Sequence, residues 1–257
     1  MDFTQFYTFL NTLGTWTIGS LVLIDLIAAT TNAFNGAILA SRRDHRRNWT
    51  TVGIVLIAVI GGIGGGVTRD VLLNTIPGAL KSPWYLILCL AAAGLAFLAM
   101  SRLSGHGIRR LFDFMAAFSL PWYAIIGTQK ALADHLPLLA VVLIGVVGPT
   151  AGRYFIDLTS GVTPQQFTRG EWFVGTAVLT SVTYIILDGF GLATPSVWPA
   201  TIIAWLVGFL FRTAALRFKW EEPEPWDQER LHASQGQPIH RDEKSSQLGQ
   251  GPALTSK

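Results

Sequence analysis

Charged residues follow a run of glycines inside one apolar segment of the chain. The stretch GGIGGGVTRD, from Gly61 to Asp70, has five glycines in six positions and then an arginine beside an aspartate. A charge at the centre of a bilayer costs at least about 2.5 kcal/mol, so such residues usually face a partner, the bundle interior or water. The pattern therefore indicates ion or solute binding on a path through a membrane. A structural ion pair, or a side chain that reaches back to the interface, is the plainer alternative.

A second stretch, GVVGPTAGRYFID, carries the same residue types. It places Arg153 and Asp157 four residues apart, on one face of a helix. Glycine disfavours a helix by up to about 1 kcal/mol relative to alanine, and Pro149 lacks an N–H and clashes with the preceding turn. Close helix packing through small residues explains one such run. Two matching runs favour interrupted helices whose free carbonyls line a water-filled path.

Three other charges lie within apolar segments. Lys130 stands near the outer end of its segment, where a lysine that reaches toward the interface is ordinary. Asp25 and Asp113 either cap a helix N-terminus, where the macrodipole favours an anion, or face the path. The sequence leaves both interpretations open.

The composition shows which elements must position these residues. The chain has 257 residues, of which 50% are hydrophobic and only 14% charged, whereas soluble domains carry about 25% charge. Its mean hydropathy is +0.42, so we expect an all-α, multi-pass membrane protein. A span needs about 20 apolar residues. Seven segments qualify, at approximately 19–40, 51–73, 83–101, 111–132, 137–158, 172–190 and 197–217.

The loops between these segments differ in charge. Cytoplasmic loops are enriched in lysine and arginine, which predicts an N-terminus outside and a cytoplasmic C-terminus. The basic residues on the predicted cytoplasmic side are Arg42, Arg43, Arg46, Arg47, Arg102, Arg109, Arg110, Arg169, Arg212, Arg217 and Lys219. The tail 221–257 has few large apolar residues and is expected to be disordered.

The two halves of the chain align with each other. A shift of 87 or 88 positions places Asp25 on Asp113, Gly65 on Gly152, Asp70 on Asp157, Pro77 on Pro164 and Trp84 on Trp172. Each half holds three spans, an odd number, so the second copy must be inverted in the membrane, and inverted repeats commonly place a transport site at their interface. The expected parts are an N-terminal segment (1–18), a first repeat (19–105), an inverted second repeat (106–192), a seventh helix (193–220) and the tail (221–257).

Enzymatic chemistry finds little support. The glycines do not fit a nucleotide-binding pattern, and no nucleophile has a histidine and an acid at a recognisable spacing. The single cysteine, Cys89, and five scattered histidines make no metal site. The basic residues stand in short loops and not in a stripe, so no nucleic acid partner is expected. We therefore predict no catalytic residues, no metal and no cofactor.

Several stretches resemble the prokaryotic members of the trimeric intracellular cation channel family, also labelled a glycine transporter domain family. They are GGGVTRDVLLNTIP, PWYL, GTQKA, GRYFIDLTSGVTPQQFTRGEWFVG and FRTAALRFKW, within residues 19–220. The resemblance implies seven helices in two inverted repeats, a homotrimer in the bacterial inner (plasma) membrane, and a K+-permeable pore through each protomer, lined by the glycine-broken second and fifth helices. Relatives often repeat G-G-G-x-x-R-D in the second half, whereas Pro149 and Arg153 replace part of it here.

By position, the resemblance also implies which residues line the pore. The pore-lining candidates are Gly64, Gly65, Gly66, Arg69, Asp70, Lys130, Gly148, Pro149, Gly152, Arg153 and Asp157. Our first hypothesis is therefore a passive monovalent cation channel, with the permeant K+ or Na+ and a bound lipid as the only ligands considered. The alternative is a secondary transporter of a small solute such as glycine, because inverted repeats with broken helices suit both. A structural or regulatory membrane scaffold is a third hypothesis, against which the intramembrane charges weigh.

Overall fold

The chain is all-helical in the parts that the computed structural model describes. These parts are residues 3–41, 49–102, 105–161, 163–164, 166, 172–194 and 196–220. They contain eight helices, in the order α1 (Phe3–Ala40), α2 (Thr51–Leu72), α3 (Gly78–Lys81), α4 (Trp84–Arg102), α5 (Gly105–Ala133), α6 (Leu138–Thr159), α7 (Phe173–Gly189) and α8 (Trp198–Phe218).

Each of the seven predicted spans falls on a helix. Five helical segments are long and apolar enough to cross a membrane, and they belong to α1, α2, α5, α6 and α8. The apolar parts of α4 and α7 are shorter, Trp84–Met100 and Phe173–Gly189. Two helical parts were not predicted from the sequence: α3, a single turn, and the part of α1 that precedes its predicted span.

Local chemistry explains several helix ends. Thr50 caps α2, because its Oγ1 accepts a hydrogen bond from the Gly53 N–H at 3.1 Å. Prolines precede α3 and α6 directly, at Pro77 and Pro137, where the missing N–H costs nothing. The chain leaves α2 through Asn74, which has a φ of 53°, a conformation that asparagine tolerates better than most residues.

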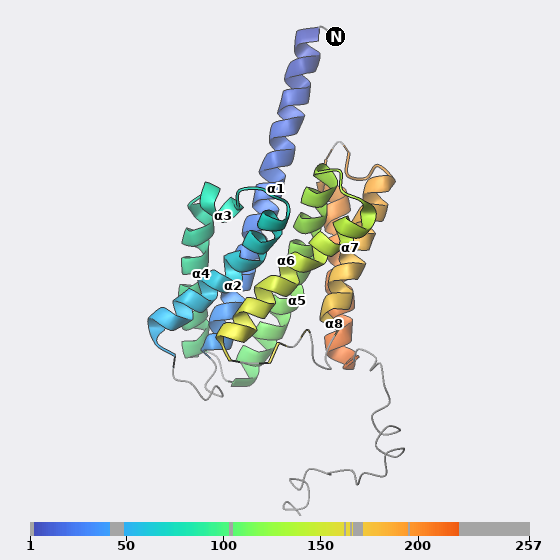
Figure 1. The fold of residues 1–257 in the computed structure, drawn as a ribbon. Helices are drawn as coiled ribbons and strands as arrows, with labels where there is room; N and C mark the ends of the chain where they lie inside the picture. The colour runs from blue at the N-terminus through green and yellow to red at the C-terminus, as the bar shows by residue number, and fades with distance from the viewer. Residues whose placement is uncertain are drawn as a thin grey trace, which may run out of the picture. The chain divides into compact units, whose positions relative to one another are not determined.

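The helices pack in two groups of three, as Figure 1 shows. α1, α2 and α4 contact one another, and so do α5, α6 and α7. The α2–α6 and α1–α5 contacts join the groups, and α8 packs against α5 and α7. The inverted relation of the two groups, and the domain boundaries, stay predictions.

The predicted topology rests in part on residues outside the described parts. Arg42, Arg43, Arg46 and Arg47 lie there, as do Arg169 and the tail 221–257. The outside N-terminus and the cytoplasmic C-terminus therefore stay predictions.

Candidate functional site

Arg69, near the end of α2, binds two carboxylates inside the helix bundle. Its Nη1 and Nη2 donate to the two oxygens of Asp25 on α1, at 3.0 and 2.9 Å. Its Nε donates to Oδ1 of the neighbouring Asp70 at 2.8 Å. The Arg69 side chain is fully buried, so the two-pronged bond to Asp25 is a charge-assisted contact out of reach of water.

Lys130, near the end of α5, approaches the same two carboxylates. Its Nζ lies 2.8 Å from Oδ1 of Asp70 and 3.4 Å from Oδ2 of Asp25. These four residues, Asp25, Arg69, Asp70 and Lys130, are called the first charge cluster below. Two cations face two anions in it, which is the pairing that buried charges require. The Lys130 side chain is 24% exposed, unlike the other three.

Two further groups fix the carboxylates. The Tyr85 hydroxyl on α4 donates to Oδ2 of Asp25 at 3.0 Å, and the Gly78 N–H at the start of α3 donates to Oδ2 of Asp70 at 3.0 Å. The first charge cluster and these two donors thus come from five helices, α1 to α5.

A second charge cluster, Arg153 and Asp157, lies on α6. The Arg153 Nε lies 2.9 and 3.0 Å from the two oxygens of Asp157, one turn further along the same helix. The Arg153 guanidinium also lies over the Phe112 ring of α5, 5.1 Å from its centroid, a cation–π contact. Both members of the pair are buried.

The two glycine runs meet where α2 contacts α6. A Cβ placed on Gly65 would overlap the carbonyl oxygen of Gly148, and one placed on Gly152 would lie 2.9 Å from the Asn32 amide nitrogen. One placed on Gly64 would lie 2.9 Å from the Phe155 ring. Both helices run unbroken through their glycine runs, and Pro149 lies inside α6. The close-packing interpretation therefore describes this structure, and interrupted helices stay a prediction that it does not bear out.

Two side chains bind carbonyl oxygens in the glycine run of α2. The Asn32 amide on α1 donates to the Gly61 carbonyl at 2.6 Å, and the Tyr123 hydroxyl on α5 donates to the Gly62 carbonyl. Asn32 and Tyr123 are both buried. Polar side chains from two neighbouring helices thus bind the backbone at the point where glycines expose it.

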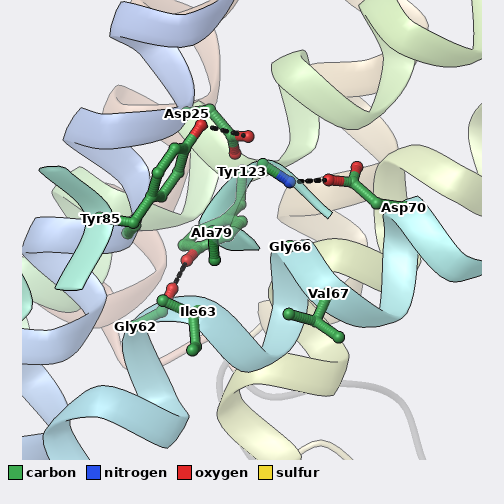
Figure 2. A pocket seen from close by; sticks show the side chains of 11 residues that line it. Asp25, Gly62, Ile63, Gly66, Val67, Asp70, Ala79, Tyr85 and Tyr123 are labelled. Atoms are coloured by element: carbon green, nitrogen blue, oxygen red, sulfur yellow. Dashed lines mark hydrogen bonds between the residues drawn. The ribbon is translucent and has the colours of Figure 1, made fainter. Parts of the chain in front are cut away.

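Two cavities border the first charge cluster. An open cavity of about 330 Å³ is lined by Asp25, Lys130, Lys81 and Asp134, among mainly apolar side chains. A small cavity of about 10 Å³, close to the room that one water molecule needs, is drawn in Figure 2. Its walls share Asp25, Gly78 and Tyr85 with the open cavity. The two cavities thus adjoin at the first charge cluster.

The polar groups around the small cavity are mostly oxygen atoms. Its walls include the carboxylates of Asp25 and Asp70, the hydroxyls of Tyr85 and Tyr123, and Gly62, as Figure 2 shows. Gly66 also lines it, and a Cβ there would lie 3.9 Å from Asp25. The described residues hold no group of three histidine, cysteine or acidic side chains placed to hold a metal ion.

The structure gathers the predicted residues into three places. Arg69, Asp70 and Lys130 meet in the first charge cluster, Arg153 and Asp157 pair in the second, and the glycines lie mostly at the α2–α6 contact. Whether they line a pore stays a prediction.

Two of the open alternatives are resolved. Asp25 and Asp113 lie well inside α1 and α5, so neither caps a helix N-terminus. Lys130 pairs with two carboxylates, so a lysine that only reaches toward the interface does not describe it.

Sequence reasoning missed Tyr85, Tyr123 and Asn32 as site residues. The available signal was a polar side chain within an apolar segment, which is rare unless it has a partner. The site prediction made from the sequence rests on charged residues, glycines and Pro149 alone.

Comparisons with known proteins follow the same two halves. A family model described as glycine transporter matches residues 22–101 and 113–189, more than half of the chain. The UPF0126 membrane protein of Deinococcus radiodurans is 29% identical over 155 residues, which are 60% of this chain and 69% of that protein. The UPF0126 membrane protein of Vibrio cholerae is 24% identical over 208 residues, 79% of this chain and 82% of that protein.

Solved structures share the fold. The TRIC trimeric intracellular cation channel orthologue from Rhodobacter sphaeroides is similar with a TM-score of 0.69 and 27% identity, over 78% of this chain and 99% of that chain. A prokaryotic TRIC channel crystallised in 0.5 M KCl has a TM-score of 0.70 and 23% identity, over 79% of this chain and 98% of that chain. At that identity the second likeness bears on the fold alone.

Proposed function

The chain belongs to the glycine transporter family, and we propose that it is a cation channel that conducts K+ through a pore in each protomer. The likeness to the Rhodobacter sphaeroides trimeric cation channel supports this proposal, because it extends over nearly all of that chain. The channel hypothesis also gives a role to intramembrane charges, which are rare without one.

The observation that carries the proposal is the first charge cluster at the junction of two cavities. An ion that entered the open cavity would meet Asp25 and Lys130 in its wall, and then the small cavity with its carboxylate and hydroxyl oxygens. Channels conduct cations by replacing part of the hydration shell with protein oxygens. The small cavity supplies oxygens of that kind within a space of about one water molecule.

The two cations of the cluster regulate this path in our proposal. Arg69 is fully buried and holds Asp25 and Asp70 in place. Lys130 faces the open cavity and binds the same carboxylates, so its ammonium occupies the place that a permeant cation would take. One charge moved fully across 100 mV is worth about 2.3 kcal/mol, comparable to one hydrogen bond to a charged group, so membrane potential would bias Lys130 between the carboxylates and the open cavity.

The rest of the proposed path passes the α2–α6 contact. Gly64, Gly65 and Gly66 on α2, with Gly148, Pro149 and Gly152 on α6, would line it, and Arg153 and Asp157 would stand beyond them. Because a Cβ at Gly65 would overlap the Gly148 carbonyl, the two helices must separate before an ion can pass between them. The structure described here thus corresponds to a closed channel in this proposal.

The assembly and location follow from the same likeness. We propose a homotrimer in a bacterial inner membrane, with the N-terminus outside, because the solved relative is called trimeric and the helices suit a multi-pass protein. The proposal includes no catalytic activity and no cofactor.

Planar bilayers containing the purified full-length protein test the proposal. Under a KCl gradient, we expect discrete single-channel steps that reverse near the K+ equilibrium potential. A reversal potential near that of Cl− would contradict cation selectivity.

A parallel assay tests the carrier alternative. Proteoliposomes loaded with unlabelled glycine are diluted into labelled glycine, and a channel should give no saturable counterflow. Silent bilayers together with saturable glycine counterflow would replace the channel by a carrier.

A further inference from the structure

Tyr123 lies between the first charge cluster and the contact of the two glycine runs. Its hydroxyl lines the small cavity and donates to the Gly62 carbonyl on α2, which Figure 2 shows. On the other side, its own carbonyl lies 3.6 Å from the position of a Cβ on Gly148 of α6. One α5 residue therefore adjoins both glycine runs.

The far side of the Gly62 turn is closed by packing. A Cβ on Gly62 would lie 2.6 Å from Sγ of Cys89 and 2.8 Å from Cβ of Ala33, and both residues are buried. The small cavity thus has no outlet in that direction. An ion leaving it toward α6 would have to pass Tyr123 and the carbonyl to which its hydroxyl is bonded.

We infer that Tyr123 is the inner gate residue of the path, with its hydroxyl bond to Gly62 holding the gate closed. This inference rests on the proposed function for the meaning of the path. Opening would exchange the hydroxyl at the Gly62 carbonyl for water or a permeant cation. The residue has a positioning role, because it acts by keeping α5 against α2 below the first charge cluster.

The first test compares two tyrosine-to-phenylalanine variants in planar bilayers. Tyr123→Phe keeps the ring and removes the hydroxyl. Losing one ordinary hydrogen bond from the closed state should raise the ratio of open to closed time roughly two- to tenfold. The matched control is Tyr184→Phe, since Tyr184 is also buried and its hydroxyl accepts a bond from Gln129 at 3.0 Å, away from both cavities. It should leave the open-to-closed ratio unchanged.

The second test does not depend on conduction. The Gly62 carbonyl lies in α2, so water that replaces the Tyr123 hydroxyl there should speed amide hydrogen exchange in the following turn, residues 63–67, as opening becomes more frequent. In the full-length protein in liposomes, Tyr123→Phe should raise this exchange rate roughly two- to tenfold. Tyr184→Phe should not.

The outcomes separate this inference from the proposed function. Faster amide exchange of residues 63–67 in a protein that passes no current would leave the Tyr123 gate standing and remove the channel. Normal single-channel currents with no change in gating or in that exchange would overturn the gate and leave the channel. A purely structural role predicts that both variants lower thermal stability alike and that neither changes gating.

Discussion

The two charge clusters both pair arginine with aspartate, but they connect different helices. In the first, Arg69 on α2 reaches Asp25 on α1, and Lys130 reaches both carboxylates from α5. In the second, Arg153 pairs with Asp157 one turn away on its own helix. The first cluster therefore ties helices of both three-helix groups together. The ion pair of the second lies on one helix, and the contact of Arg153 with Phe112 reaches α5 in the same group.

This difference shows which ion pairs depend on the position of one helix relative to another. A bond between helices breaks when the helices separate, whereas a pair within one helix moves with it. The first cluster also borders both cavities. We therefore expect conduction and stability to depend more on the first cluster than on the second.

Replacing the two arginines should give the largest contrast. Arg69→Met leaves two buried carboxylates with Lys130 alone and should lower the free energy of unfolding by about 3–5 kcal/mol, the usual result of breaking a buried ion pair. Arg153→Met removes the Nε contacts to Asp157 and the contact with the Phe112 ring. It leaves one carboxylate and not two, and the Arg153 side chain is 10% exposed, so the change should cost roughly 1–3 kcal/mol. Unfolding in mixed micelles, titrated with dodecyl sulfate, measures both.

A second change makes this contrast sharper. Adding Asp25→Asn to Arg69→Met should recover part of the stability, because one uncompensated charge disappears. Equal losses for the two single variants would mean that the clusters are equivalent.

The glycine contact offers a contrast of intermediate size. Gly65→Ala places a methyl group against the backbone of α6 and should cost about 1–3 kcal/mol, as overpacking does. Gly152→Ala meets the Asn32 amide at 2.9 Å instead of overlapping a backbone atom, so its cost should be smaller, although any shift of Asn32 strains its bond to the Gly61 carbonyl. Gly94→Ala is the control, since nothing lies within 4 Å of its Cβ position.

Thermal unfolding of the three variants in the same micelles checks this order. Alanine in a helix is favoured over glycine by up to about 1 kcal/mol, so Gly94→Ala should be neutral or stabilising. A neutral Gly65→Ala would contradict the close contact of α2 and α6.

The K+ current of a Lys130 variant tests the charge balance of the first charge cluster. Lys130→Met leaves one net negative charge beside the open cavity and should raise the K+ current roughly two- to fivefold at low salt, because the field concentrates cations. In 1 M KCl the increase should shrink, since the Debye length falls to about 3 Å. Lys81→Met, in the wall of the same cavity, is the control with a smaller effect. An increase that ignores salt would argue against an electrostatic cause.

We expect the smallest change in stability at Asp113, the residue that the repeat alignment pairs with Asp25. Asp113 aligns with Asp25 but is only half-buried, so Asp113→Asn should change the free energy of unfolding by less than about 1 kcal/mol. Asp25→Asn should cost more, because Arg69, Lys130 and Tyr85 all bind Asp25. Chemical unfolding of the two variants is compared side by side, and a larger loss for Asp113→Asn would contradict the role given to Asp25 in the first charge cluster.

The helices could be predicted because hydropathy and length are local properties. Apolar segments of about 20 residues identify spans without any knowledge of their neighbours. The pairing of Arg69 with Asp25 could not be predicted in this way, because the two residues are 44 positions apart and the link depends on how α1 crosses α2.

The unbroken glycine helices show a second limit. The low helix propensity of glycine and proline predicts interrupted helices at Gly64, Gly65 and Pro149, yet α2 and α6 continue through these residues. Within a bilayer every backbone group needs a partner, and the helix provides most of these partners, so the environment overrides propensity. Tyr123 and Asn32 are polar side chains in apolar segments, which predicts that each has a partner, but the carbonyls that they bind leave no mark in the sequence.

Single-channel recording of Asp70→Asn beside the unaltered protein tests the central claim that the first charge cluster lies on a cation path. Both proteins are recorded in the same KCl gradient after gel filtration has shown equal assembly. We predict K+ currents that reverse near the K+ equilibrium potential for the unaltered protein, and a clearly smaller unitary K+ current for Asp70→Asn. Equal unitary currents in the two proteins would place the cluster off the path and contradict the account.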